Sequence, residues 1–379
     1  MADAHPIPKK SRLEAPLLRS QRTLLIRVEE EFSDARRWDQ FVESHPESRF
    51  CHLYGYRCLK QVYGYRPRYF AFLKGEQIVA VLPAFEARSL FLGRRLVSQP
   101  FCEYGGLLLN PAADVADLEE IFGHLRQFLT ERGISGLELH GRQGIHLPGC
   151  ERFLTRCNTE HCAYLPLEGS LEEIWSNVVT YQVRKAVQKA ERCGLTTEER
   201  SDPEVITRDF YPSYLGAMAR LGVPPHSLDY YLRCQAAFGD RMRIFWAIHK
   251  GRPIAGLLGF SCGRRVSILN IVSDERFWEL RPNDLVHWAY IRWAHTAGFK
   301  VFDFGSVRYE GQLRYKQKWG CTIDDHGYFF LSAAENSSKT GTFDSSSPTM
   351  QRFSKLWSRY MPGPVGRFIG PFVRKHLVR

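Results

Sequence analysis

The chain has 379 residues, of which 44% are hydrophobic and 25% are charged, an ordinary globular composition. This length suggests two domains. No stretch approaches the roughly 18 to 20 apolar residues of a membrane-spanning helix, which excludes an integral membrane protein. Residues 1–20 have basic side chains but no apolar segment behind them, and the cysteines are scattered. We therefore expect a cytoplasmic protein with reduced thiols.

The net charge of +11 is concentrated in the two tails. Residues 1–27 contain six Lys/Arg and two acids, and residues 351–379 contain seven Lys/Arg and no acid. The body between them has 39 basic and 39 acidic residues. A neutral body argues against a general nucleic-acid binder, so DNA is not an expected partner.

The first half of the chain contains a hairpin and a helix-to-strand step. Residues 1–20 lack periodicity and indicate a flexible basic arm. The segment Arg68–Phe85 predicts two strands that turn at Lys74-Gly75. In Phe122–Gly141 a helix ends at a glycine and leads into a short strand.

A similar series follows a predicted helix over residues 171–195. One face of this helix is apolar and the other basic, and Gly194 stops it. Its apolar face holds Val179, Val183, Ala186, Val187 and Ala190. Segment Arg243–Phe260 then repeats the hairpin, and Trp288–Gly305 repeats the helix-to-strand step. Two such signals in the same order favour a duplicated α/β unit over a chance recurrence of common elements.

These elements divide the chain into five parts. After the arm, a first domain is expected at residues 21–165 and a second at 166–330. Residues 331–350 are rich in Ser and Thr and predict a linker. Residues 351–379 form a basic, aromatic tail that is interrupted by prolines.

Several common catalytic motifs are absent. The sequence has no Gly-x-Gly-x-x-Gly, no Walker loop and no Gly-x-Ser-x-Gly, and no covalent nucleophile can be nominated. One group of residues, Cys150, Cys157, His161 and Cys162, invites a metal site, but its spacing matches no common zinc pattern. We therefore expect no metal, and buried free thiols instead.

The most informative segment is Phe302–Gly320, FDFGSVRYEGQLRYKQKWG. A strand over residues 301–304 is expected to end in Gly305-Ser306 and to be followed by a cationic loop. Four cations lie within eleven residues of this loop, interleaved with aromatic side chains: Arg308, Arg314, Lys316 and Lys318. Such a loop suits a ligand with a phosphate or carboxylate. The alternative is a solvated basic loop whose Tyr315 and Trp319 pack inward.

This segment resembles the closing signature of the FemAB family, Asp-Phe-Gly…Gly…Phe-Lys…Trp-Gly, with Tyr315 in place of phenylalanine. Other family-like segments are Val97–Phe101 with Tyr104-Gly105-Gly106, Arg184-Lys185-Ala186, Leu221–Pro224 and Arg281-Pro282-Asn283. The similarity spans about residues 35 to 330 and looks closest to the FemAB-like proteins found beside exopolysaccharide export and protein-sorting systems. The sequence lacks the long coiled-coil arm of some relatives, which puts any tRNA contact through such an arm in doubt.

The resemblance implies an α/β (α+β) protein of two tandem GNAT-like domains with a central cleft, the second of the BioF2-like acetyltransferase type. It implies an acyltransferase with no permanently bound cofactor, whose donor is an aminoacyl-tRNA, an acyl carrier or an acyl-CoA. Acyl-CoA enzymes hold the pyrophosphate on a Gly-rich loop at a helix N-terminus. Residues 273–284, SDERFWELRPND, contain no glycine, so we favour the first two donors.

Roles for individual residues follow from the same resemblance. Lys316 is the first catalytic candidate, as the cation that holds a phosphate or the developing oxyanion. Asp303 is the second, as a base or an orienting group, although it could simply cap the turn after its strand. Substrate-binding residues are expected to be Arg308, Tyr315, Tyr104, Arg184, Ser306 and Trp319.

The tail leaves two alternatives open. Phe353, Leu356, Trp357 and Tyr360 fall at helical spacing beside basic residues. The tail could lie on an anionic membrane surface, or it could pack on the body with a solvated basic side.

We expect a cytoplasmic N-acyltransferase that transfers an acyl or aminoacyl group to an amino group of a cell-envelope or exopolysaccharide precursor. If the tail lies on a membrane, the enzyme is peripheral on the inner face of the cytoplasmic membrane. The alternative is a catalytically silent GNAT-fold binding module in polysaccharide assembly.

Overall fold

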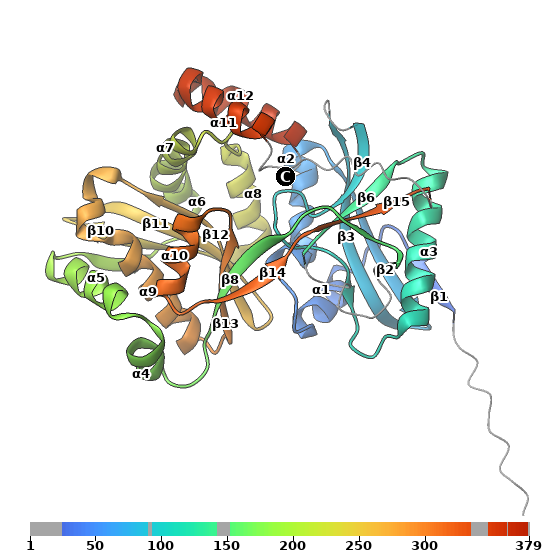
Figure 1. Cartoon of the computed structure of the whole chain (residues 1–379), viewed down its shortest axis with the longest axis horizontal. Coiled ribbons are helices and arrows are strands. Elements are labelled where there is room, and N and C mark those ends of the chain that lie inside the picture. The colour runs from blue at the N-terminus through green and yellow to red at the C-terminus, as the bar shows by residue number, and fades with distance from the viewer. Residues whose placement is uncertain (1–24, 90–92, 142–151, 335–347, 362, 378–379) are drawn as a thin grey trace, which may run out of the picture.

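The computed structural model describes residues 25–89, 93–141, 152–334, 348–361 and 363–377 (Figure 1). The predicted arm at residues 1–20 and most of the linker at 331–350 lie outside the described residues. The elements up to residue 166 are β1 (Ile26–Glu29), α1 (Ala35–Ser44), α2 (Leu59–Tyr63), β2 (Arg66–Lys74), β3 (Gln77–Ser89), β4 (Gly93–Ser98), β5 (Leu108–Leu109), α3 (Val115–Glu131), β6 (Gly136–His140), β7 (Thr155–Arg156) and β8 (Glu160–Pro166).

The later elements repeat this alternation of helices and strands. They are α4 (Leu171–Glu173), α5 (Tyr181–Arg192), β9 (Thr196–Glu199), α6 (Pro203–Val205), α7 (Tyr211–Leu221), α8 (Leu228–Phe238), β10 (Met242–His249), β11 (Arg252–Cys262), β12 (Arg265–Ser273), α9 (Pro282–Thr296), β13 (Val301–Val307), α10 (Glu310–Lys318), β14 (Thr322–His326), β15 (Tyr328–Ser332), α11 (Pro348–Tyr360) and α12 (Gly363–Leu377).

Two sheets with the same strand order confirm the predicted duplication. The first sheet runs β1-β2-β3-β4-β6-β15-β7, with β5 beside β3, and the second runs β9-β10-β11-β12-β13-β8-β14. Each is antiparallel except for one pair at the same position, β4 with β6 and β12 with β13. The parallel pair of the second sheet is short, because only residues 265–267 and 301–303 are in register.

The two sheets exchange a strand across the boundary expected at residue 165. Strand β8 follows the first half in sequence but pairs with β13 and β14 in the second sheet. Strand β15 follows the second half but pairs with β6 and β7 in the first sheet. Each sheet is therefore completed by a segment from the far side of the boundary, which links the two halves through backbone hydrogen bonds.

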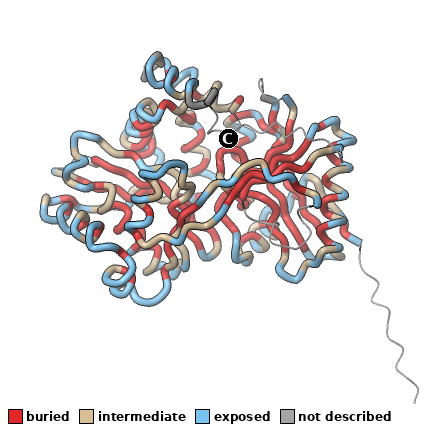
Figure 2. Tube along the Cα trace, viewed as in Figure 1, coloured by how far each residue is buried: buried red, intermediate tan, exposed pale blue. Residues whose placement is uncertain are grey.

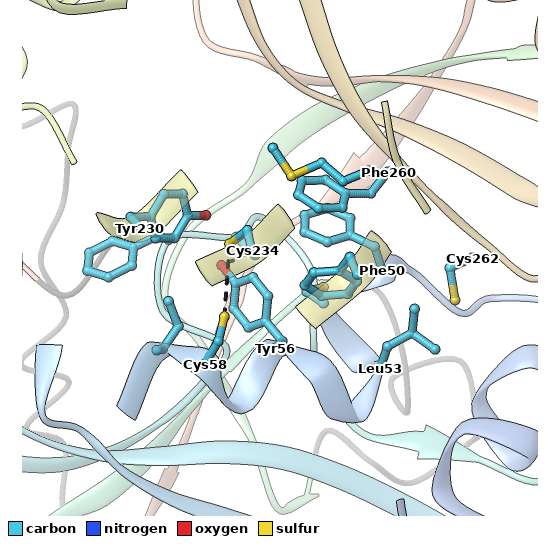
Figure 3. Packing of buried hydrophobic residues seen from close by; sticks show 14 of the residues in the cluster. Phe50, Leu53, Tyr56, Cys58, Tyr230, Cys234, Phe260 and Cys262 are labelled. Atoms are coloured by element: carbon cyan, nitrogen blue, oxygen red, sulfur yellow. Dashed lines mark hydrogen bonds between the residues drawn. The ribbon is translucent and has the colours of Figure 1, made fainter. Parts of the chain in front are cut away.

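The space between the sheets is filled by a shared hydrophobic core. Helices α1 and α2 of the first half and α7 and α8 of the second contribute to one buried cluster (Figures 1 and 2). In this cluster the rings of Phe50 and Phe260 stack at 4.4 Å, and the thiols of Cys58 and Cys234 lie 3.9 Å apart (Figure 3). Because each pair joins residues from different halves, the halves pack as one body.

Both hairpins and both helix-to-strand steps are confirmed. β2 and β3 turn at Lys74-Gly75, and β10 and β11 turn at Lys250-Gly251, where both residues have positive φ. Helix α3 leads into β6, and α9 leads into β13. These elements depend on local alternation and glycine-terminated helices, which the sequence displays directly.

Two predictions of local structure are wrong. The helix expected over residues 171–195 breaks at Val179 and Thr180, which have extended backbone, and only its second part, α5, ends as predicted before Gly194. Three consecutive β-branched residues at 178–180 disfavour the helix there.

The cationic loop expected after β13 is instead helix α10. Glu310 lies in its first turn and Lys316 and Lys318 in its last, so the charges complement the helix dipole, and Gly320 ends it with φ of 75°. Helical spacing places Arg314 and Lys318 on one face and Lys316 on the other.

Candidate active site

Asp303 on β13 joins the two halves of the molecule. Its side chain is buried, with only 1% exposed. Oδ1 accepts a hydrogen bond from the Tyr104 hydroxyl at 3.0 Å and another from the backbone N–H of Gly305 at 2.8 Å. Tyr104 belongs to the first half, and Gly305 follows in the turn of β13. The carboxylate therefore caps the turn that follows it, which is the second role that the sequence allowed for Asp303. It also binds Tyr104 of the opposite half.

Two buried arginines neutralise this carboxylate. Arg49 Nε lies 3.2 Å from Oδ2 of Asp303, and Arg265 Nη1 lies 3.5 Å from the same oxygen. Burial alone would lower the pKa of Arg49, but the Asp303 charge, together with smaller contributions from Tyr104 and Glu47, leaves the pKa raised. Burial and the neighbouring Arg49 charge lower the pKa of Arg265. Burial, and then the Asp303 charge, raise the pKa of Tyr104, so its hydroxyl stays protonated and donates.

Glu103 makes a second contact across the same boundary. Ser306 Oγ donates to Glu103 Oε1 at 2.9 Å, and Arg308 Nη2 donates to the same oxygen at 3.0 Å. Burial would raise the pKa of Glu103, but the Arg308 charge and the Ser306 hydrogen bond leave it lowered. Arg308 keeps a mostly exposed side chain, 61%, so it also reaches solvent.

Lys316 points inward from α10 toward the same strand. Its Nζ donates to the carbonyl of Gly305 at 2.9 Å and to that of Ser306 at 2.6 Å. An ammonium group has three N–H donors, and these two hydrogen bonds use two of them. The residue is 7% exposed, and burial lowers its pKa. Burial of this kind brings the pKa of a lysine closer to neutral pH.

Five of the eight predicted site residues thus come together where the halves meet. They are Tyr104, Asp303, Ser306, Arg308 and Lys316. We call these five residues and Glu103 the interface cluster. Sequence reasoning missed Glu103, Arg49 and Arg265. Glu103 lies between Val97–Phe101 and Tyr104-Gly105-Gly106, which the sequence analysis singled out, whereas Arg49 and Arg265 are distant in sequence and carry no local signal.

The other three predicted residues lie elsewhere. Trp319 is fully buried in the core of the second half, near His287 and Phe304, which suits packing rather than direct contact with a substrate. The Tyr315 hydroxyl lies 3.3 Å from His287 Nδ1. Arg184 donates to three backbone carbonyls of residues 175–179, so it holds the break before α5.

Neither helix N-terminus next to a parallel strand pair is well suited to a pyrophosphate. At α9, Pro282 lacks an N–H and Asp284 places a carboxyl group in the first turn. At α3, the Asp114 side chain already accepts from the N–H of Asp117, and Asp117 is itself acidic.

The outward face of α10 borders a surface hollow of about 600 Å³. Its lining residues are Thr180, Tyr181, Gln182, Arg314, Gln317 and Lys318. The hollow therefore combines the N-terminus of α5 with two cations and with Tyr181, which is 68% exposed. Such a combination favours a phosphate-bearing group.

Across the described residues, no three His, Cys, Asp or Glu side chains are grouped as metal ligands would be. Cys150, one member of the candidate metal group, lies outside the described residues. No helix in the described ranges is both long enough and apolar enough to cross a membrane.

Comparison with known proteins identifies the domain type. Residues 178–317 match the family model of the acetyltransferase (GNAT) domain. The structure of FemX is similar with a TM-score of 0.67 at 14% identity, covering 80% of this chain and 97% of FemX. No curated protein sequence matches this chain.

Two further solved structures share the fold. A tandem GNAT protein from the clavulanic acid biosynthesis pathway has a TM-score of 0.50 at 12% identity, covering 82% of this chain and 99% of its own. The C-terminal domain of a candidate lysylphosphatidylglycerol synthetase from Agrobacterium fabrum has a TM-score of 0.54 at 11% identity, covering 85% and 96%. The expected double GNAT fold is confirmed, and so is the acyltransferase class.

Proposed function

We propose, from the double GNAT fold of this acyltransferase, that the chain transfers an acyl or aminoacyl group to an amino group of a cell-envelope or exopolysaccharide precursor. The reaction would take place on the cytoplasmic side of the membrane. The observation that supports this proposal is the interface cluster, in which cationic, carboxylate and hydroxyl groups of both halves meet.

The proposed reaction follows the chemistry of amide formation. The acceptor amine attacks the acyl carbonyl carbon, a C–N bond forms, and the bond from that carbon to the donor oxygen or sulfur breaks. The amine loses a proton and the leaving group gains one. The spare N–H of Lys316 is the proposed donor to the developing oxyanion or to a phosphate of the substrate.

Asp303 is proposed as an orienting group rather than a base. Both of its oxygens are engaged, Oδ1 by Tyr104 and Gly305 and Oδ2 by two arginines. A carboxylate held in this way positions the turn that presents Ser306 and Lys316. Arg308, which is paired with Glu103 yet exposed, is the proposed contact for an anionic group of the acceptor.

The proposed donor carries a phosphodiester, as both an aminoacyl-tRNA and an acyl carrier protein do. Support comes from the hollow beside α10, with Arg314 and Lys318, and from the poor fit of the α9 N-terminus to a pyrophosphate. The exposed ring of Tyr181 in this hollow suits stacking on a terminal base, which favours the aminoacyl-tRNA of the two.

A donor competition experiment tests the function. Purified protein is offered labelled aminoacyl-tRNA, acyl carrier protein and acyl-CoA in parallel, with amine-bearing envelope and polysaccharide precursors. Transfer from a phosphodiester donor is the expected result. Transfer from acyl-CoA alone would overturn the donor assignment, and protection of a donor from hydrolysis without transfer would indicate the silent binding module.

Lys316→Ala tests the residue assignment. Transfer should fall by roughly 100-fold, because one oxyanion donor is commonly worth that much. Lys189→Ala, on the exposed face of α5, is the matched control and should leave transfer unchanged. If Lys316→Ala retains full activity and a native melting profile, the assignment is wrong.

A further inference from the structure

Helix α12 turns its large apolar residues away from the body. Val365, Phe368, Ile369 and Phe372 are 41%, 79%, 43% and 58% exposed. Their spacing of three and four residues places them on one face, and we call these four residues the outer stripe. Surface helices of globular proteins normally turn such an apolar face toward the core, whereas α12 turns it toward solvent.

The contacts on the opposite face fix this orientation. Gly366 and Gly370 are buried, and a Cβ on Gly370 would lie 2.3 Å from Pro225 Cδ. Arg374 Nη1 donates to the carbonyl of Pro224 at 3.2 Å, and the Tyr65 hydroxyl donates to the carbonyl of Lys375. Since Gly370 allows close packing against Pro225, the larger side chains are left outside.

Helix α11 contributes less exposed apolar surface than the sequence indicated. Trp357 is buried, Phe353 is partly buried against its ring at 5.7 Å, and Leu356 remains 57% exposed. The two C-terminal helices lie at one edge of the molecule, over α7 (Figure 1). The exposed apolar surface of the tail is therefore mainly on α12.

A basic pocket of about 530 Å³ lies at the C-terminal end of α12. Its lining includes four cations, one carboxylate and a histidine: Arg66, Arg88, Arg94, Lys375, Glu86 and His376. Lys375 follows Phe372 by three residues and Phe368 by seven, so it continues the line of the outer stripe into the pocket. An apolar surface thus runs directly into a site with an excess of positive charge.

We propose that α12 lies on an anionic phospholipid membrane, with the outer stripe among the acyl chains and the basic pocket against a lipid phosphate. Charge complementarity supports this occupant, because residues 351–379 carry seven Lys/Arg and no acid. A second copy of the chain is disfavoured, because it would bring two tails of the same strong positive charge together. The 15 residues of α12 give a contact about 22 Å long.

Vesicle co-sedimentation of the full chain tests this proposal. Binding to equimolar phosphatidylcholine and phosphatidylglycerol should be at least roughly ten-fold tighter than binding to phosphatidylcholine alone, and should weaken with salt. The double variant Phe368→Ser with Phe372→Ser should lose roughly ten-fold or more of the binding. Leu25→Ser, which removes an 81% exposed leucine outside the tail, is the matched control and should bind normally.

The pocket is tested separately with Arg88→Gln combined with Lys375→Gln. Binding to the anionic vesicles should weaken, while Lys189→Gln, on α5, should change nothing. Equal binding of the stripe variant and the parent would overturn the proposal, as would a stripe-dependent dimer in light scattering. Thermal melting checks that the variants fold. No transfer assay is involved, so this result and that of the donor experiment are independent.

Discussion

Asp303→Asn should destabilise the protein strongly, because it removes charge and leaves shape nearly unchanged. The asparagine Oδ1 can still accept from the Tyr104 hydroxyl and the Gly305 N–H. The side-chain NH2 would then face the guanidinium groups of Arg49 and Arg265, which lie 3.2 and 3.5 Å from the present oxygen. The amide donors would then face guanidinium donors, and the two buried cations would lose the carboxylate that lies between them.

The expected loss is about 3–5 kcal/mol in the free energy of unfolding, the usual cost of removing one partner from a buried ion pair. Asp303 is 1% exposed and both arginines are 8% exposed, so solvent screens this site little. A domain of ordinary stability has about 5–15 kcal/mol in total, so the variant should retain the fold with a much reduced margin.

Urea denaturation monitored by circular dichroism measures the loss. Asp229→Asn is the matched control, because Asp229 also pairs with an arginine, Arg233, at 2.8 Å, but at a half-exposed helix surface. Its removal should cost less than about 1 kcal/mol. Equal effects of the two substitutions would refute the conclusion that Asp303 is the electrostatic link between the halves. Arg49→Met in a double-mutant cycle with Asp303→Asn should show strong coupling.

Three further results are expected. Phe50→Ala removes the ring stacked on Phe260 and should lower the free energy of unfolding by about 3–5 kcal/mol. Both halves should still unfold in one transition, measured by fluorescence and by circular dichroism. Two separate transitions would contradict the shared core. Burial, reinforced by the Arg49 charge, lowers the pKa of His52 from 6.5 to about 3. As the pH falls below 6.5, His52 takes up a proton in the unfolded chain but not in the folded one. The free energy of unfolding therefore falls, by about 2 kcal/mol at pH 5. His52→Gln should reduce this pH dependence in urea titrations at pH 5 and 8. Arg308→Gln breaks a partly exposed ion pair with Glu103 and should lower the free energy of unfolding by less than about 1 kcal/mol. A larger loss would show that this pair stabilises the contact between the halves.

Local patterns were sufficient for the repeated elements of this fold. The two hairpins, the glycine-terminated helices and the duplicated order follow from alternation and turn chemistry, because these signals act over a few residues. The Phe302–Gly320 segment also identified most of the interface cluster, since Asp303, Ser306, Arg308 and Lys316 lie within fourteen residues of one another.

Only the tertiary structure decided which partners these residues meet. Arg49 lies 254 residues before Asp303 in the chain, and nothing near it indicates a buried counter-charge. The exchange of β8 and β15 between the sheets is equally invisible, because strand pairing depends on contacts far apart in sequence. The orientation of α12 depends on Gly370, which fits against Pro225, so the face with the large apolar residues points outward, contrary to its hydrophobic pattern. Periodicity determines that such a face exists, but only packing determines whether the body covers it.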